Sequence, residues 1–140
     1  MGCEDKINPY DLERDPLRGK IGGEDWNYTA GNAQFNTFDN DITGLITAID
    51  ISDPCAIRIS NDPHITLKFP AVRRNYTLPF INQNDGFVIF NLKGGTKKLT
   101  ATSGFLEVVA ITSTEVVGYI SADFDEKNNV QGAFLLQICN

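Results

Sequence analysis

The side chains with catalytic potential are few and isolated in this sequence. It contains one histidine, His64, and no acid stands at a spacing that would pair with it. Nucleophilic catalysis needs a base beside the nucleophile, and a zinc site needs three or four His or Cys ligands. The sequence therefore predicts no catalytic residue, no metal site and no cofactor.

Two clusters of acidic residues resemble fragments of a calcium-binding loop. They are Asp39-Asn40-Asp41 and Asp123-Phe124-Asp125. A complete loop requires Gly at its sixth position and a bidentate Glu at its twelfth, but counting from Asp123 these positions hold Asn128 and Phe134. Turn formation explains both clusters better, and a weak, irregular calcium site stays open as the alternative.

The best candidate for a contact surface is the basic stretch Arg73-Arg74-Asn75-Tyr76. Two guanidinium groups beside an aromatic ring can hold a carboxylate, a phosphate or a sulfated sugar. A solvated loop between strands is the simpler interpretation, because surface arginines are common. Trp26, the only tryptophan, is either a platform for sugar stacking or a core side chain. The candidate ligand-binding residues are Arg73, Arg74, Tyr76 and Trp26.

Cys3 is the candidate for membrane attachment. The triplet Met1-Gly2-Cys3, followed by a charged stretch, resembles the end of a bacterial lipoprotein signal, whose Cys becomes the lipidated first residue of the mature protein. We expect a chain that starts at the cleavage site, with Met1 added. Two alternatives stay open. One is a eukaryotic protein acylated at Gly2 and Cys3, although Lys6 stands where that motif requires Ser or Thr. The other is a Cys that occurs there by chance.

Cys55 and Cys139 are the other two cysteines. In an exported protein, two cysteines apart from the anchor most often pair, so we expect a disulfide between them. In the chain-entropy model, a disulfide that closes so long a loop stabilises the fold by about 4 kcal/mol. The alternative is two buried free thiols, since free cysteine is commonly buried.

Charge and composition exclude some partners and limit the domain count. The 140 residues carry 12 basic and 18 acidic side chains, a net charge of −6. Nucleic acid is an unsuitable partner, because phosphate contacts require positive charge. No apolar run approaches the roughly 20 residues of a membrane-spanning helix. Residues 1–19 are charged and lack apolar periodicity, so we expect a flexible tether there, followed by a single, monomeric domain over residues 20–140.

Alternating apolar and polar residues between short polar turns predict an all-β protein with about ten antiparallel strands. The clearest strands form two hairpins near the C-terminus, where Gly118 and Gly132 mark bulges or close approaches of another segment. The predicted strands are Lys20–Thr29, Asn32–Phe38, Ile42–Ile51, Ala56–Ser60, His64–Phe69, Gly86–Leu92, Lys97–Ser103, Phe105–Thr112, Glu115–Phe124 and Val130–Cys139. We expect a two-layer β-sandwich, with a closed, lipocalin-like barrel as the alternative.

Structural glycines, aromatics and cysteines recur over residues 20–139. They are Gly22-Gly23, Trp26, Gly31, Ala33, Pro54-Cys55, Gly104-Phe105-Leu106-Glu107, Val117-Gly118-Tyr119, Val130-Gln131-Gly132-Ala133-Phe134 and Cys139. This pattern resembles a family of uncharacterised small all-β lipoprotein domains of Bacteroidetes. The resemblance implies the fold and an outer-membrane lipoprotein in the cell envelope, on either membrane face. It implies no activity and carries over no catalytic residue, and the basic loop at Arg73-Arg74 does not match it.

Three functions are compatible with these features. The one we expect is a non-catalytic cell-envelope lipoprotein that acts as a binding module for a glycan or an envelope protein. The second is a small β-barrel that binds a lipid or another hydrophobic ligand in an apolar cavity. The third is a carboxylate-based hydrolase, which needs two acids at a defined separation. The candidates for such a pair are Asp50, Asp53, Glu107 and Asp123.

Overall fold

A computed structural model of the chain describes residues 15–58, 61–95 and 97–140. Eleven strands and two short 3-10 helices make up the regular structure of this part. The strands are β1 (Arg18–Ile21), β2 (Glu24–Asn27), β3 (Ala30–Asn36), β4 (Asp41–Thr47), β5 (His64–Pro70), β6 (Asn75–Thr77), β7 (Phe87–Asn91), β8 (Lys98–Thr100), β9 (Ser103–Ile111), β10 (Glu115–Asp125) and β11 (Asn128–Ile138). The helices are η1 (Pro54–Ala56) and η2 (Lys93–Gly95).

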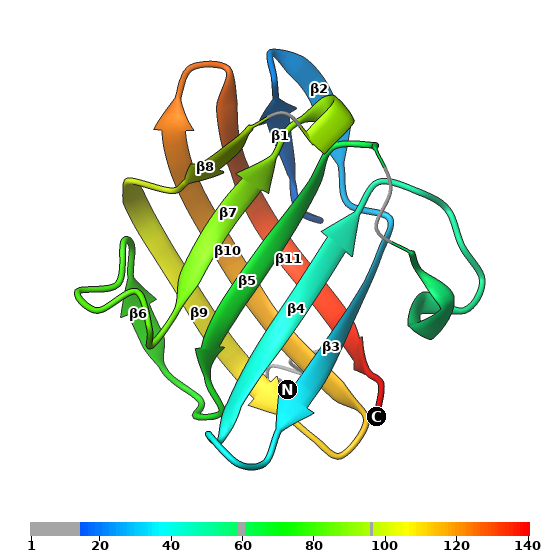
Figure 1. Ribbon diagram of the computed structural model, residues 1–140, viewed down its shortest axis with the longest axis vertical. Coiled ribbons are helices and arrows are strands. Elements are labelled where there is room, and N and C mark those ends of the chain that lie inside the picture. The colour runs from blue at the N-terminus through cyan, green and yellow to red at the C-terminus, as the bar shows by residue number, and fades with distance from the viewer. Residues whose placement is uncertain (1–14, 59–60, 96) are drawn as a thin grey trace, which may run out of the picture.

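The strands form one curled, mixed sheet, a half-barrel (Figure 1). The hydrogen-bonded order is β6-β9-β10-β11-β3-β4-β5-β7-β8, with β1 attached to β11 and β2 to β1. The strand pairs are antiparallel, except that β11 runs parallel to β3 through Gln137 and Ile138. The earlier part of β11, at Asn129–Gln131, pairs with β1 instead. The prediction of an all-β fold with about ten strands is confirmed.

The curl of the sheet brings two walls face to face. Strands β4, β5 and β7 lie in front of β9, β10 and β11 (Figure 1). The chain passes between the walls at Ala101–Thr102, where the Ala101 N–H donates to the Val88 carbonyl (2.9 Å) and the Thr102 N–H to that of Asp123 (2.8 Å). Apolar side chains of both walls make the core, among them Ile42, Ile46, Ile65, Leu67, Phe69, Val88, Phe90, Leu106, Ile120, Val130, Phe134 and Leu136.

The two glycines that the sequence marks in the C-terminal hairpins do stand at close approaches. At Gly118 the pairing of β10 with β9 shifts by one residue, and a Cβ there would lie 2.6 Å from the Glu107 carbonyl oxygen. At Gly132 the φ angle is +143°, and a Cβ would lie 2.5 Å from the Cα of Leu17. Both predictions are confirmed.

Two of the predicted strands are wrong in detail. The range Lys20–Thr29 is a hairpin, because Gly22 and Gly23 adopt φ angles of +64° and +83° and reverse the chain between β1 and β2. In the range Ala56–Ser60 the described residues begin with the end of η1 and continue without strand structure to Arg58, while residues 59–60 lie outside the described part. The carboxylate of Asp53 accepts a hydrogen bond from the Cys55 N–H (3.0 Å) and so caps η1.

The packed domain begins before residue 20. Leu17 is fully buried, its N–H donates to the Ala133 carbonyl, and its own carbonyl accepts from the Tyr28 N–H, both at 2.9 Å. The last residues of the tether expected over residues 1–19 therefore belong to the packed domain, because Leu17 fills the core beside Gly132. Cys3 and the rest of residues 1–14 lie outside the described part of the chain.

The structure brings Cys55 and Cys139 to disulfide-bonding distance, with Cα atoms 5.6 Å apart. Cys55 lies in η1, within the long connection from β4 to β5, and Cys139 directly follows β11. Beside them the Asn32 side chain of β3 donates to the Pro54 carbonyl (2.8 Å). The β4–β5 connection is thus held against the pair β11–β3.

Candidate functional site

Six strands place their outward side chains in straight rows across the sheet. In the first row each residue lies directly opposite the next on the neighbouring strand, in the order Thr77, Phe105, Ser121, Gln131, Arg18 and Asn27. The second row reads Ser103, Asp123, Asn129, Lys20 and Asp25. The alternate residues of these strands point inward and are buried, for example Leu106, Ile120 and Val130. We call these two rows, with Glu107 and Tyr119 of the adjacent row and Asp15 beside them, the outer face.

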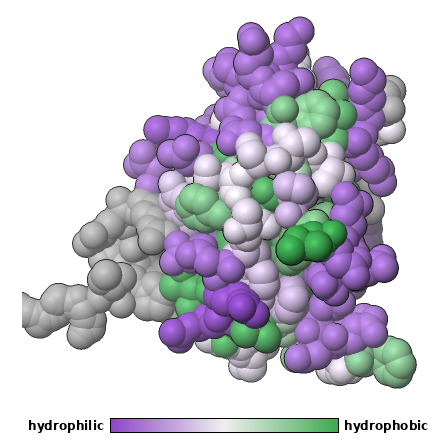
Figure 2. Space-filling model, turned by 90° about the vertical axis from the view of Figure 1, so that its left-hand side faces the viewer, coloured by the Kyte–Doolittle hydropathy of each residue, from purple (hydrophilic) through white to green (hydrophobic). Residues whose placement is uncertain are grey.

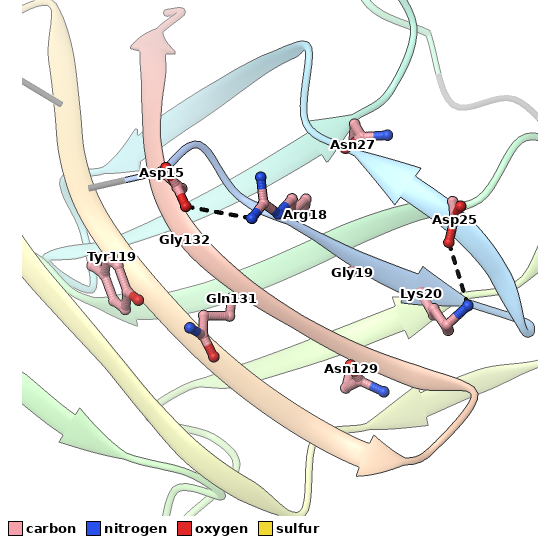
Figure 3. Close-up of a pocket in the computed structure, with 10 residues that line it drawn as sticks. All are labelled: Asp15, Arg18, Gly19, Lys20, Asp25, Asn27, Tyr119, Asn129, Gln131 and Gly132. Carbon is pink, nitrogen blue, oxygen red and sulfur yellow. Dashed lines mark hydrogen bonds and ion pairs between the residues drawn. The ribbon is translucent and has the colours of Figure 1, made fainter. Parts of the chain in front are cut away.

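An open groove of about 490 Å³ crosses the outer face. Figure 3 shows its polar side chains on one side of β10, β11, β1 and β2. Its lining residues are Asp15, Arg18, Gly19, Lys20, Asp25, Asn27, Tyr119, Asn129, Gln131 and Gly132. At Gly19 a Cβ would collide with the carbonyl oxygen of Asn129, so β1 approaches β11 there only because the residue has no side chain.

The two cations of the groove are each paired with an acid. The Arg18 guanidinium lies 3.4 Å from a carboxylate oxygen of Asp15, and the Lys20 ammonium lies 3.3 Å from one of Asp25 (Figure 3). All four side chains are about half exposed or more, from 49% for Lys20 to 86% for Asp25. Exposed pairs of this kind contribute little to stability. These groups are therefore available to a ligand that offers hydrogen bonds in exchange.

Three amide side chains line the groove, namely those of Asn27, Asn129 and Gln131. Asn129 is held in place, because its Nδ2 group donates to the carbonyls of Asp125 (3.1 Å) and Glu126 (3.2 Å). An amide both donates and accepts, which matches a hydroxyl group that does the same. The groove thus suits a ligand rich in hydroxyl groups.

Two aromatic rings stand beside the amides. Phe105 of β9 and Tyr119 of β10 are stacked, with ring centroids 5.9 Å apart and planes inclined by 15°. Tyr119 lines the groove, and Phe105 is 38% exposed on the outer face. The aromatic pair therefore extends the polar groove into an apolar shelf.

The basic loop predicted from the sequence is only partly available for contacts. The Arg74 guanidinium lies 5.8 Å from the centroid of the Tyr76 ring. The Tyr76 hydroxyl donates to the Val72 carbonyl (2.9 Å), and its ring stacks on Phe80 with centroids 5.3 Å apart. Burial raises the pKa of Tyr76, and the positive charge of Arg74 partly opposes this. Arg73 and Arg74 are exposed, while Tyr76 acts mainly as a structural support for their loop.

Trp26 is a core residue and lies apart from this loop. It is 3% exposed, and its indole N–H donates to the Pro63 carbonyl (3.0 Å). Four other strands separate β2 from β6 in the sheet. The structure thus brings Arg73, Arg74 and Tyr76 together but not Trp26. The single histidine, His64, is 9% exposed, with its Nδ1 atom 2.9 Å from the Asp62 carbonyl oxygen.

The acidic clusters behave as turns. Asp125 accepts hydrogen bonds from the Lys127 N–H (2.9 Å) and the Asn128 side chain (3.0 Å), which is turn chemistry. Asp41 lies in a second open pocket, 3.6 Å from the Lys68 ammonium, and its other carboxylate oxygen is buried without a hydrogen-bond partner. Within residues 15–58, 61–95 and 97–140, no group of three or more His, Cys, Asp or Glu side chains is arranged to hold a metal ion.

Most residues of the outer face escape prediction from the sequence. Arg18, Lys20 and Gln131 are ordinary polar residues in three separate segments, and only the pairing of β1 with β11 brings them together. The available signal is the alternation of apolar and polar residues in β10 and β11, which indicates that one side of these strands is polar. It does not show which strands lie beside them.

Comparison with protein-family models, with curated proteins and with solved structures finds no match. In the described part of the chain, no helix has the length and apolar character that crossing a membrane requires. The chemistry of the surface is therefore the basis on which a function can be inferred.

Proposed function

We propose that this protein is a non-catalytic binding module of the cell envelope that holds a polar, hydroxyl-rich ligand on its outer face. The observation that carries the proposal is the register of β9, β10, β11, β1 and β2, which aligns amides, paired charges and two stacked rings along one open groove. Ligand sites combine a few placed polar groups with aromatic surface. A glycan fits this combination better than a lipid.

The packing of the interior supports a surface site over an internal one. Side chains of both walls meet in a single core, where Phe69, Phe90 and Phe134 are fully buried. An apolar ligand would need a cavity in place of such side chains. The side of the molecule in Figure 2 shows scattered apolar residues separated by hydrophilic ones.

The setting of the acids supports binding without catalysis. Asp15 and Asp25 are 74% and 86% exposed and each faces a cation, whereas a general acid of a hydrolase is typically held in an apolar pocket. Of the acids that the sequence offered for a catalytic pair, Asp53 caps η1, and Glu107 and Asp123 lie in different rows of the outer face. We further propose that lipidation of Cys3 attaches the module to the outer membrane, as the resemblance to the Bacteroidetes lipoprotein domains suggests.

A binding screen with two matched double variants tests the proposal. Full-length protein is applied to immobilised oligosaccharides and, separately, to solubilised envelope proteins. Arg18→Ala with Gln131→Ala should weaken the binding of any captured ligand by at least about tenfold, because both side chains line the groove. Arg73→Ala with Arg74→Ala should leave it unchanged. The proposal is wrong if the second variant loses binding while the first binds as the wild type does.

A further inference from the structure

We infer that the ligand of the outer face is a neutral oligosaccharide that lies across the strands, with one sugar ring stacked on Phe105. This inference rests on the proposed function and specifies its ligand. It combines three features of the described surface: the aromatic shelf, the charge balance and the length of the first row.

The aromatic shelf supplies a flat apolar surface beside a polar groove. The C–H groups on one face of a pyranose ring are apolar, while its hydroxyl groups point outward around the rim. A sugar stacked on Phe105 would bury its apolar face on the ring, and its hydroxyl groups would reach the amide of Gln131, which lies two strands away in the same row. The Tyr119 ring lies beside that of Phe105 and nearly parallel to it, which enlarges the apolar surface.

The charge of the outer face selects against an acidic sugar. Its two cations, Arg18 and Lys20, are already paired with acids. Its four acidic side chains are Asp15, Asp25, Glu107 and Asp123, so the outer face has a net charge of −2. The whole chain has a net charge of −6. An anionic ligand would be repelled by the negative charge of the outer face and by that of the whole chain. A neutral ligand would not be repelled.

The length of the row requires more than one sugar. Four steps between neighbouring strands separate Phe105 on β9 from Asn27 on β2. At about 4.8 Å a step, the row is about 19 Å long. A single sugar cannot contact both the aromatic shelf and the far end of the groove, so affinity should increase with the length of the oligosaccharide.

Calorimetric titration of the full-length protein with neutral, acidic and amino-sugar oligosaccharides, each as disaccharide and hexasaccharide, tests the inference. We expect binding of a neutral series, tighter for the hexasaccharide. Phe105→Ala and Phe105→Leu should both weaken it by at least about tenfold, because leucine restores apolar volume without a flat ring. Phe38→Ala, at a residue that is 93% exposed in the β3–β4 turn, is the control and should bind unchanged.

The possible results separate this inference from the proposed function. If the double variant of Arg18 and Gln131 loses binding while both Phe105 variants retain it, the groove is the site and the stacked sugar is wrong. Binding of acidic or amino sugars in preference to neutral ones also overturns the inference, as does equal affinity for the two lengths. If the neutral sugars bind but neither the groove variant nor the Phe105 variants weaken them, both proposals fail. Absence of binding by all three series rejects the inference, and capture of an envelope protein through the groove would then leave the proposed function standing.

Discussion

At Gly132 two segments of backbone meet with no room for a side chain between them. A Cβ would lie 2.5 Å from the Cα of Leu17 and 2.6 Å from its nitrogen, and the φ angle is one that side chains disfavour. We expect Gly132→Ala to lower the free energy of unfolding by roughly 1–3 kcal/mol, as measured by urea denaturation.

Gly95→Ala is the matched control for this substitution. Gly95 also has a positive φ, +67°, but no atom lies within 4 Å of the position of a Cβ. It should therefore show only the backbone cost, about 1 kcal/mol. Equal destabilisation by the two variants would contradict the close approach of residues 16–17 to β11.

Tyr28 should make stability depend on pH in the alkaline range. Burial raises the pKa of its phenol above the usual 10.0, and the hydrogen bond that the Tyr28 oxygen accepts from the Leu135 N–H (3.2 Å) opposes this in part. The folded state therefore keeps a proton that the unfolded chain has lost. The resulting stability is complete below about pH 10 and is lost as the pH rises through the folded pKa.

Tyr28→Phe removes this proton and tests the prediction. The variant should be less stable at neutral pH, because it lacks the hydrogen bond to Leu135. Between about pH 9 and about pH 11, its urea midpoint should fall less steeply than that of the wild type. Parallel curves for the two proteins would show that Tyr28 does not carry the effect. Burial also raises the pKa of Tyr76. Because Tyr76 is present in both proteins, its contribution to the pH dependence cancels in the comparison.

Single residues with a packing role could be read from the sequence, whereas the outer face could not. Gly118 and Gly132 stood out because glycine inside a strand has few other uses. For Trp26 the sequence left two interpretations open, a sugar-stacking platform and a core side chain, and the structure shows the core side chain. Gln131 carries no such signal. Its importance comes from lying between Ser121 and Arg18, and that depends on which strands are neighbours.

At the scale of elements, the link between Cys55 and Cys139 should be a major source of stability. The two cysteines are 84 residues apart in sequence, so a disulfide would stabilise the fold by about 4.5 kcal/mol in the chain-entropy model. Cys55→Ala with Cys139→Ala should lower the free energy of unfolding by up to this amount. Thiol titration of denatured, unreduced wild-type protein should leave both residues unreactive, and two reactive thiols would reject the bond.

The strands themselves were predictable where a short polar turn joins two alternating runs. That condition holds for β9, β10 and β11, whose hairpins match the prediction. It fails for the first predicted strand, Lys20–Thr29, which Gly22-Gly23 divides by a turn. It also fails around Pro54, where a side-chain cap from Asp53 stabilises η1 instead of a strand. Local chemistry of this kind overrides the apolar pattern.

For the molecule as a whole, the lipid anchor is the remaining prediction. Cys3 lies outside the described residues, so the test is biochemical. If the anchor is present, mass spectrometry of the protein from its native host should find a diacylated or triacylated Cys3, and the protein should sediment with the outer membrane. Cys3→Ser should move it to the soluble fraction without changing its ligand affinity. An unmodified thiol at Cys3 would reject the anchor.

The central place of β11 determines when the molecule can fold. This strand pairs with β10, β1 and β3, and so joins the segments that precede it in the chain. A nascent polypeptide that leaves the ribosome in order has none of these pairings until Ile138 has been synthesised. Until then β1, β3 and β10 lack this partner, so the sheet cannot be completed before the end of β11 has emerged.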